Sequence, residues 1–251
     1  MIDVVCVCVG TAYDPELYVE QLRLGVEKHL GVSHRFNVIT DNPGHPCYAK
    51  NNIRTIVVND WPEANQPRKY WWYKMQMFDG RCRFPGTVLY FDLDVIITGP
   101  VDKFVDYHTD KFAICQDFNR HWLLDYHVSN SSIMRFHAPS YYDIMDQFNP
   151  DRKLHMAKNL GDQDYITKYF ADRTDKIWWP QTWAQSFKWE VYRGGLIESG
   201  TGLDVHGQWP AESSKYYKPG QPWELPADCS VVVFHGKPNP WNTEFGKQHQ
   251  L

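Results

Sequence analysis

The sequence predicts an α/β fold in which a mostly parallel sheet is flanked by helices. Residues 4–9 form a continuous apolar and largely β-branched run, the pattern of a strand that is buried on both faces. A helical pattern follows, with apolar residues every four positions until Gly31, and residues 36–39 form a second apolar run. A strand, a helix and a strand in this order predict the start of a parallel sheet.

The same patterns place the remaining elements along the chain. Asp14 and Pro15 suit the cap and first residue of the first helix. Between residues 178 and 226 the chain is rich in Gly, Pro and Trp, which indicates long loops that build a binding face. Further strands are expected over residues 53–58, 87–91, 112–115, 132–136 and 230–234, and helices over residues 70–78, 139–148 and 162–170.

The composition limits the class of protein. The 251 residues carry 26 Lys+Arg against 30 Asp+Glu, a net charge of -4, which argues against bulk electrostatic binding of nucleic acid. No apolar run reaches the roughly 18–20 residues of a membrane helix, and the first residues lack the basic start of a signal peptide. The six cysteines form no CxxC pair and no zinc-binding spacing, so we expect reduced thiols in a cytoplasmic protein.

Two aspartates, Asp92 and Asp94, directly follow the strand predicted at residues 87–91. Alternation along an extended chain puts both carboxylates on one side, at the carboxyl edge of the sheet where α/β folds bind ligands. Two such carboxylates repel each other unless a cation joins them, so a divalent metal is the natural occupant. The plainer interpretation is a turn or cap at a strand end, because short motifs often match by accident.

A second motif, His235-Gly236-Lys237, follows the last predicted strand. The imidazole can complete a metal site with the two aspartates, and the lysine supplies a compact positive charge for a phosphate. The glycine lets a phosphate approach the backbone. Taken alone, such a histidine is more often a hydrogen-bonded structural residue.

Three further polar residues are candidates for the same site. Asp162 and Gln163 open a predicted helix, where they either bond sugar hydroxyls or, in the plainer interpretation, cap the helix. Lys74 lies before the aspartate pair and is either a surface lysine or a group that neutralises a phosphate.

Six short motifs occur in a fixed order over nearly the whole chain: Thr11 and Tyr13, Lys74, Asp92 with Asp94, Asn130-Ser131-Ser132, Asp162-Gln163-Asp164, and His235 through Trp241. This combination resembles the GT-A glycosyltransferases, in particular glycosyltransferase family 8, which includes glycogenin and bacterial lipooligosaccharide galactosyltransferases. The sequence departs from that family in two places. The segment from His235 to Trp241 is shorter, and two serines follow Asn130 where the family favours Ala-Gly.

The resemblance implies a single GT-A domain over residues 1–251. About residues 1–130 would bind the nucleotide-sugar, and about residues 131–251 would form the acceptor side. It also implies a bound Mn²⁺ or Mg²⁺ ion and assigns roles to particular residues. The metal ligands would be Asp92, Asp94 and His235, the donor contacts Thr11, Tyr13, Lys74, Asp92, Asn130 and Lys237, and the catalytic residues Asp162, Gln163 and Lys74.

The implied reaction moves a sugar from a nucleotide-sugar, a UDP-sugar before others, to an acceptor hydroxyl with retention of configuration. The acceptor would be a saccharide or glycoconjugate or, in a phage enzyme, a hydroxymethylated base in DNA. Aromatic rings between Trp178 and Trp223 are candidate walls for that acceptor.

Two other classes remain open from the sequence. Asp92-Leu93-Asp94-Val95 faintly resembles the nucleophile motif of haloacid-dehalogenase phosphatases, although that motif normally ends the first strand of its domain. A non-catalytic module that binds sugar or nucleic acid through exposed tryptophans is the other alternative, and it would not need paired carboxylates.

Overall fold

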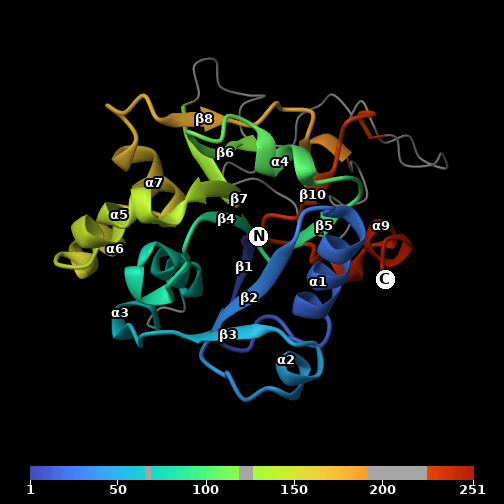
Figure 1. Cartoon of the computed structure of the whole chain (residues 1–251), viewed down its shortest axis with the longest axis horizontal. Coiled ribbons are helices and arrows are strands. Elements are labelled where there is room, and N and C mark those ends of the chain that lie inside the picture. The colour runs from blue at the N-terminus through green and yellow to red at the C-terminus, as the bar shows by residue number, and fades with distance from the viewer. Residues whose placement is uncertain (66–68, 119–126, 192–224) are drawn as a thin grey trace.

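The computed structural model describes residues 1–65, 69–118, 127–191 and 225–251 (Figure 1). Within these ranges the strands form two sheets. The larger sheet contains β1 (Ile2–Cys8), β2 (His34–Thr40), β3 (Arg54–Val57), β4 (Thr87–Phe91), β6 (Phe112–Gln116), β7 (Ser129–His137) and β8 (Lys176–Trp178). The smaller sheet contains β5 (Val95–Ile97), β9 (Ala184–Ser186) and β10 (Val231–Val233).

The larger sheet has the strand order β3-β2-β1-β4-β7-β6-β8. Strand β7 runs antiparallel to both of its neighbours, β4 and β6, whereas the other pairs in this sheet are parallel. The prediction of a mostly parallel sheet is therefore confirmed.

Helices cover both faces of this sheet (Figure 1). The α-helices are α1 (Tyr18–His29), α2 (Pro46–Lys50), α3 (Pro62–Asn65), α4 (Asp102–Asp106), α5 (Asp143–Phe148), α6 (Arg152–Lys158), α7 (Asp162–Tyr169) and α9 (Glu244–Gln248). The 3₁₀ segments are η1 (Tyr70–Phe78), η2 (Gly80–Cys82), η4 (Ala138–Tyr141) and η6 (Pro240–Asn242), and η5 (Phe187–Val191) is a π-helical turn.

The alternation of side chains along β1 explains the two layers. Val4 and Cys6 belong to the apolar core shared with α1 and α4, while Val5 belongs to the core shared with η1, α5 and α7. A strand that buries both of its faces reads as a continuous apolar run, which is why this strand was evident from the sequence.

Three of the predicted helices differ from the prediction. Residues 70–78 form a 3₁₀ helix where an ordinary helix was expected, and residues 139–148 divide into η4 and α5. The first helix begins at Tyr18. Asp14 lies in the turn before it, where its carboxylate accepts a hydrogen bond from the Glu16 N–H at 3.0 Å.

The aspartate pair lies where the two sheets meet. The N–H of Asp92 donates to the carbonyl of Ser132 at 2.9 Å, so this residue prolongs the β4–β7 pairing of the larger sheet. The carbonyl of Asp94 accepts from the N–H of Phe234 at 2.9 Å, which prolongs the β5–β10 pairing of the smaller sheet. The chain thereby brings His235 next to Asp94. In the described part of the chain, no helix is long and apolar enough to cross a membrane.

Candidate active site

Four polar residues, the buried Lys74, Ser131 and Asp162 and the half-buried Asp92, form what we term the Lys74 cluster. The Lys74 Nζ lies 2.9 Å from Asp92 Oδ1, 2.9 Å from Ser131 Oγ and 3.4 Å from Asp162 Oδ2. The Ser131 hydroxyl donates to Asp162 Oδ2 at 2.6 Å. Lys74 belongs to η1, Ser131 to β7 and Asp162 to α7, and Asp92 directly follows β4. The cluster therefore joins the sheet to the helices on one of its faces.

Charge balance keeps this lysine protonated. Burial lowers the pKa of Lys74, but the carboxylates of Asp162 and Asp92 outweigh burial and raise the pKa overall. The Tyr90 hydroxyl donates a further hydrogen bond to Asp92 Oδ1 at 2.5 Å. Tyr90 was given no role from the sequence, and Ser131 was named only as part of the Asn130-Ser131-Ser132 motif. Tyr90 lies two residues before Asp92 and therefore on the same side of the strand.

A second group, Asp94, Phe118, Ser186 and His235, forms what we term the His235 cluster. The Ser186 Oγ and the His235 Nε2 are hydrogen-bonded at 2.6 Å. The ring of Phe118 stacks on the imidazole, with a centroid distance of 5.3 Å and an interplanar angle of 5°. The Asp94 carboxylate is held by the backbone N–H of Gly236, the residue after the histidine.

The two titratable groups of the His235 cluster are shifted toward their neutral forms. Burial, followed by the charge of Asp92, raises the pKa of Asp94 to about 7 against the opposing effect of Lys74. Burial, followed by the charge of Lys188, lowers the pKa of His235 to about 3. At neutral pH the imidazole is therefore uncharged, and the carboxyl group of Asp94 is close to its midpoint.

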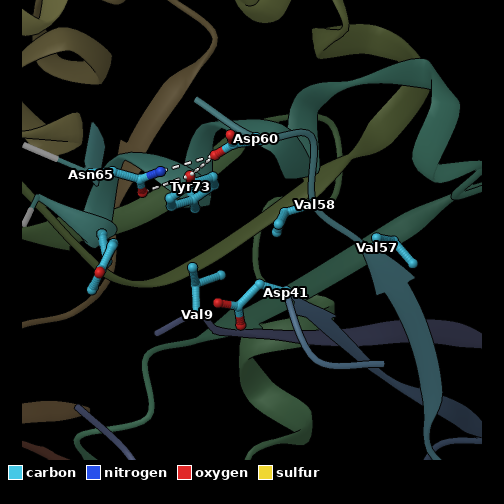
Figure 2. Close-up of a pocket in the computed structure, with 8 residues that line it drawn as sticks. Val9, Asp41, Val57, Val58, Asp60, Asn65 and Tyr73 are labelled. Carbon is cyan, nitrogen blue, oxygen red and sulfur yellow. Dashed lines mark hydrogen bonds between the residues drawn. The ribbon is translucent and has the colours of Figure 1, made fainter. Parts of the chain in front are cut away.

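Two open pockets lie at the carboxyl ends of β1, β2 and β3, as expected for ligand sites in α/β sheets. The larger, of about 500 Å³, is shown in Figure 2 and is lined by Val9, Asp41, Val57, Val58, Asp60, Asn65, Tyr70 and Tyr73. The smaller, of about 270 Å³, is lined by Cys8, Gly10, Thr11, Tyr13, Asp14, Pro15, Thr40, Asp41, Asn42, His45 and Tyr48.

Gly10 and Asp41 connect the two pockets. The Asp41 carboxylate accepts from the Gly10 N–H at 3.0 Å, which joins the loop after β1 to the end of β2. Gly10 has a φ of +73°, and a Cβ there would lie 2.5 Å from a ring carbon of Tyr70. A glycine is required at this point both by its backbone conformation and by this close contact.

The predicted nucleoside contacts lie at the smaller pocket. Thr11 is exposed in the turn after β1. The ring of Tyr13 packs edge-on against Tyr18 at 4.7 Å between centroids, and its hydroxyl lies 3.5 Å from Asp94 Oδ2. Tyr13 thus extends from the pocket to the aspartate pair.

The other predicted site residues lie in three different environments. Gln163 Nε2 is 3.5 Å from Asp117 Oδ2, so an acidic partner from the end of β6 faces the start of α7. Asn130 is buried, and its side-chain oxygen accepts from the Ser132 N–H at 3.0 Å, within β7 where the register of the β6–β7 pairing shifts. Lys237 is exposed, one residue beyond Gly236.

The tryptophans expected to form an acceptor wall divide into two groups. Trp179 is buried and packs on Phe104 at 5.0 Å between centroids, and Trp183 packs on the same ring at 5.4 Å. Trp179 therefore belongs to the core and cannot stack on a ligand. Trp209 and Trp223 lie outside the described residues.

No group of three or more His, Cys, Asp or Glu side chains within the described ranges is arranged to hold a metal ion. Asp92, Asp94 and His235 are brought close by the strand pairing, but each is hydrogen-bonded to a protein group. The predicted ligand set is therefore adjacent in the fold without forming a ready coordination shell.

No protein-family model matches this sequence, and no curated protein matches it either. Solved structures match its fold over almost its full length. An active-site mutant of LgtC matches with a TM-score of 0.62 and 13% identity, over 99% of this chain and 94% of that chain. The galactosyltransferase LgtC in complex with donor and acceptor sugar analogs matches with a TM-score of 0.57 and 11% identity, over the same shares of the two chains.

The glycosyltransferase GlyE of Streptococcus pneumoniae matches with a TM-score of 0.58 and 11% identity, over 97% of this chain and 57% of that chain. The protein therefore has the fold of the GT-A glycosyltransferases. Within that class it resembles family 8, the family of LgtC, as the sequence motifs predicted.

Proposed function

We propose that this protein is a glycosyltransferase that moves a sugar from a nucleoside diphosphate sugar to an acceptor hydroxyl. The observation that carries the proposal is the meeting of the Lys74 and His235 clusters at Asp92 and Asp94, on the ligand-binding edge of a GT-A sheet. The two pockets at the ends of β1 to β3 lie at the same edge and offer space for a nucleotide.

The donor would extend from the smaller pocket to the aspartate pair. Thr11 and Tyr13 would contact the nucleoside, with uridine as the first choice, and Asp92 would contact the diphosphate end. The residues up to about 130 would form this donor half of one domain, and the residues from about 131 onward the acceptor half.

The reaction needs a stabilised leaving group and a shielded sugar. Negative charge grows on the diphosphate as the glycosidic bond breaks, and a protonated Lys74, with Lys237 nearer the surface, would stabilise that charge. Asn130, Asp162 and Gln163 would orient the donor sugar. Asp162 is held in place by Ser131, which limits the reorganisation that the reaction requires.

The residues present fit a divalent cation, Mn²⁺ or Mg²⁺, by the chemistry of the donor set. Asp94 is buried beside Asp92, and its pKa is raised partly by that charge, a repulsion that a cation would relieve. Ser186 is hydrogen-bonded to Nε2 of His235, and a hydrogen bond at one ring nitrogen is usual for metal-binding histidines. When bound, such an ion stabilises charge on a diphosphate.

The finer features of the reaction follow the family resemblance. We propose retention of configuration, and a saccharide or glycoconjugate acceptor ahead of a hydroxymethylated DNA base. The phosphatase alternative has little support, because Asp92 follows the fourth strand of the sheet and is bound by Lys74 and Tyr90. A nucleophilic aspartate would need to be open to its phosphate ester.

The test is a thermal-shift screen followed by a transfer assay. UDP, GDP, CDP and ADP are each added with EDTA and with Mn²⁺, and we expect UDP to raise the melting temperature by about 5–10 °C at 100 times its Kd, only when metal is present. The Asp94→Asn variant is the matched control and should lose the metal-dependent part of the shift.

Labelled nucleotide-sugars are then incubated with oligosaccharides in one arm and with hydroxymethylpyrimidine DNA in the other. Full activity in excess chelator would remove the metal from the proposal. The absence of both nucleotide stabilisation and transfer, in every arm, would overturn the proposed function itself.

A further inference from the structure

The helix η1 separates two sides of the candidate site. A 3₁₀ helix has three residues per turn, so residues three apart share a face. Tyr70 and Tyr73 line the larger pocket on one face. Trp72 lies on a second face, where it is buried and stacks on Phe148 at 5.6 Å between centroids. The third face starts with Trp71.

This third face leads directly into the Lys74 cluster. Lys74 follows Trp71 by three residues and is the buried cation of that cluster, whereas Trp71 is 46% exposed. On this face of η1, the exposed indole of Trp71 therefore lies one turn before the buried ammonium group of Lys74.

The start of α7 holds the indole in place. A Cβ at Gly161 would lie 3.4 Å from Trp71 Nε1 and 3.5 Å from its Cδ1, so the ring edge lies against the glycine that precedes Asp162. Leu160, one residue earlier, is 88% exposed. An exposed indole and an exposed leucine thus lie within three residues along the chain of the buried Lys74 and the buried carboxylate of Asp162.

This arrangement matches the chemistry of a sugar ring. A pyranose presents a face of C–H groups that stacks on an indole and an edge of hydroxyls that needs polar partners. Asp162 and Gln163, proposed above to orient the donor sugar, lie just beyond Gly161, so a ring on Trp71 would lie beside the donor sugar, where an acceptor hydroxyl must be placed. The nucleoside cannot use this platform, because both pockets lie on the side of η1 that carries Tyr70 and Tyr73, or beyond it.

We infer that Trp71, with Leu160 beside it, is the platform on which a sugar ring of the acceptor stacks. The inference rests on the proposed function and adds to it the binding subsite and the ligand class. It lies outside the acceptor wall that the sequence placed between Trp178 and Trp223, of which Trp179 is buried in the core and Trp209 and Trp223 lie outside the described residues.

The test compares Trp71→Ala with Trp71→Phe and with Leu154→Ala, a matched change at a 48% exposed apolar residue of α6. Lactose, maltose and cellobiose are the probes. Their binding is followed by NMR saturation transfer, UDP binding by calorimetry, and acceptor and donor KM by the transfer assay. Trp71→Ala should raise the acceptor KM about tenfold and abolish saturation transfer to the disaccharides.

Trp71→Phe should retain most of the affinity, and Leu154→Ala and the UDP affinity should stay unchanged. An unaltered acceptor KM in Trp71→Ala would overturn the inference, and an equal rise in donor KM would reassign the platform to the donor. If the wild-type protein shows neither nucleotide stabilisation nor sugar transfer, the proposed function fails, yet saturation transfer that depends on Trp71 would still support the platform. Transfer to DNA alone would overturn it.

Discussion

Asp92 and Asp94 lie two residues apart, yet they are in opposite electrostatic environments. Asp92 is paired with Lys74 at 2.9 Å and accepts a hydrogen bond from Tyr90. Asp94 is held by a backbone N–H, and burial together with Asp92 raises its pKa to about 7. Asp92 is therefore paired with a lysine, whereas the surroundings of Asp94 disfavour its ionised form.

The difference indicates where the proposed cation would act. In the Lys74 cluster, two carboxylates surround one lysine, so the positive charge is built into the fold. In the His235 cluster, burial shifts the pKa values of Asp94 and His235 toward their neutral forms, and the like charges of Asp92 and Lys188 add to these shifts. A divalent ion at Asp94 would make the two clusters electrostatically alike.

The largest expected effect is the loss of the built-in cation. Lys74→Met should lower the free energy of unfolding by about 3–5 kcal/mol, because it leaves the buried carboxylate of Asp162 and the half-buried carboxylate of Asp92 without their cation. Urea denaturation at pH 7 measures the change. Lys237→Met is the matched control at an exposed lysine and should stay within about 0.5 kcal/mol of wild type.

A double variant sharpens this prediction. Adding Asp162→Asn to Lys74→Met removes one of the two stranded charges and should recover part of the lost stability. If the double variant is as unstable as the sum of the two single variants, the two residues are not coupled, and the Lys74 cluster is not the electrostatic unit described above.

The next prediction is that substituting the two aspartates changes the stability of the protein in opposite directions when no metal is present. With metal present, Asp94→Asn should lower turnover by about 10²-fold, the scale of losing one key electrostatic contact. In EDTA the same change should stabilise the protein at pH 8, whereas Asp92→Asn should destabilise it. Turnover and urea denaturation of both variants measure this contrast, and equal signs in EDTA would contradict it.

The pH dependence of Asp94 follows from its raised pKa. The folded protein keeps a proton on this group up to about pH 7, while the unfolded chain loses it near its ordinary value of 3.8. Stability is therefore fully present below about pH 4 and is lost as the pH rises to about 7, by at most about 4 kcal/mol. The gap between Asp94→Asn and wild type should widen over this window in EDTA and close when Mn²⁺ is added.

A smaller effect is expected at Tyr90. Tyr90→Phe removes the hydrogen bond to Asp92 and should cost about 1.5–3 kcal/mol of stability, the usual range for a hydrogen bond to a charged group. A double-mutant cycle with Asp92→Asn isolates the contribution. A coupling energy near zero would show that the tyrosine does not hold the carboxylate.

The smallest effect concerns Lys237. Lys237→Ala should reduce turnover only a few-fold, because an exposed ammonium is screened by water and salt. The reduction should shrink further in 0.5 M NaCl, whereas the loss in Lys74 variants should not. A Lys237 effect as large as that of Lys74 would mean that the 235–237 loop closes over the diphosphate.

The sequence was sufficient where each strand buries both faces. Residues 87–91 were predicted as a strand with the observed bounds, because an unbroken apolar run has few other interpretations. The order of motifs was also sufficient to identify the fold. Strand β5 was missed because three residues after Asp94 carry no periodic signal, and their partner β10 lies far along the chain.

The charged residues of the candidate site were chosen from the sequence, but the hydrogen bonds that link them were not predicted. Asp92, Lys74 and Asp162 were chosen for their charge, and the structure brings them together. Ser131 was missed as a link between them, because a serine inside a strand has no pattern that distinguishes it. Trp71 was missed because exposure is a property of the folded surface, which a tryptophan in an aromatic run does not reveal.

The position of β10 between β5 and β9 has a consequence for synthesis on the ribosome. The residues of the Lys74 cluster have all been translated once Asp162 is added, so that part of the site can assemble while the rest of the chain is still emerging. The small sheet cannot form until its central strand, residues 231–233, has been translated, and His235 is added after that strand. A nascent chain stalled before residue 230 would therefore hold the built-in cation and lack the half of the site at which an added ion is proposed to bind.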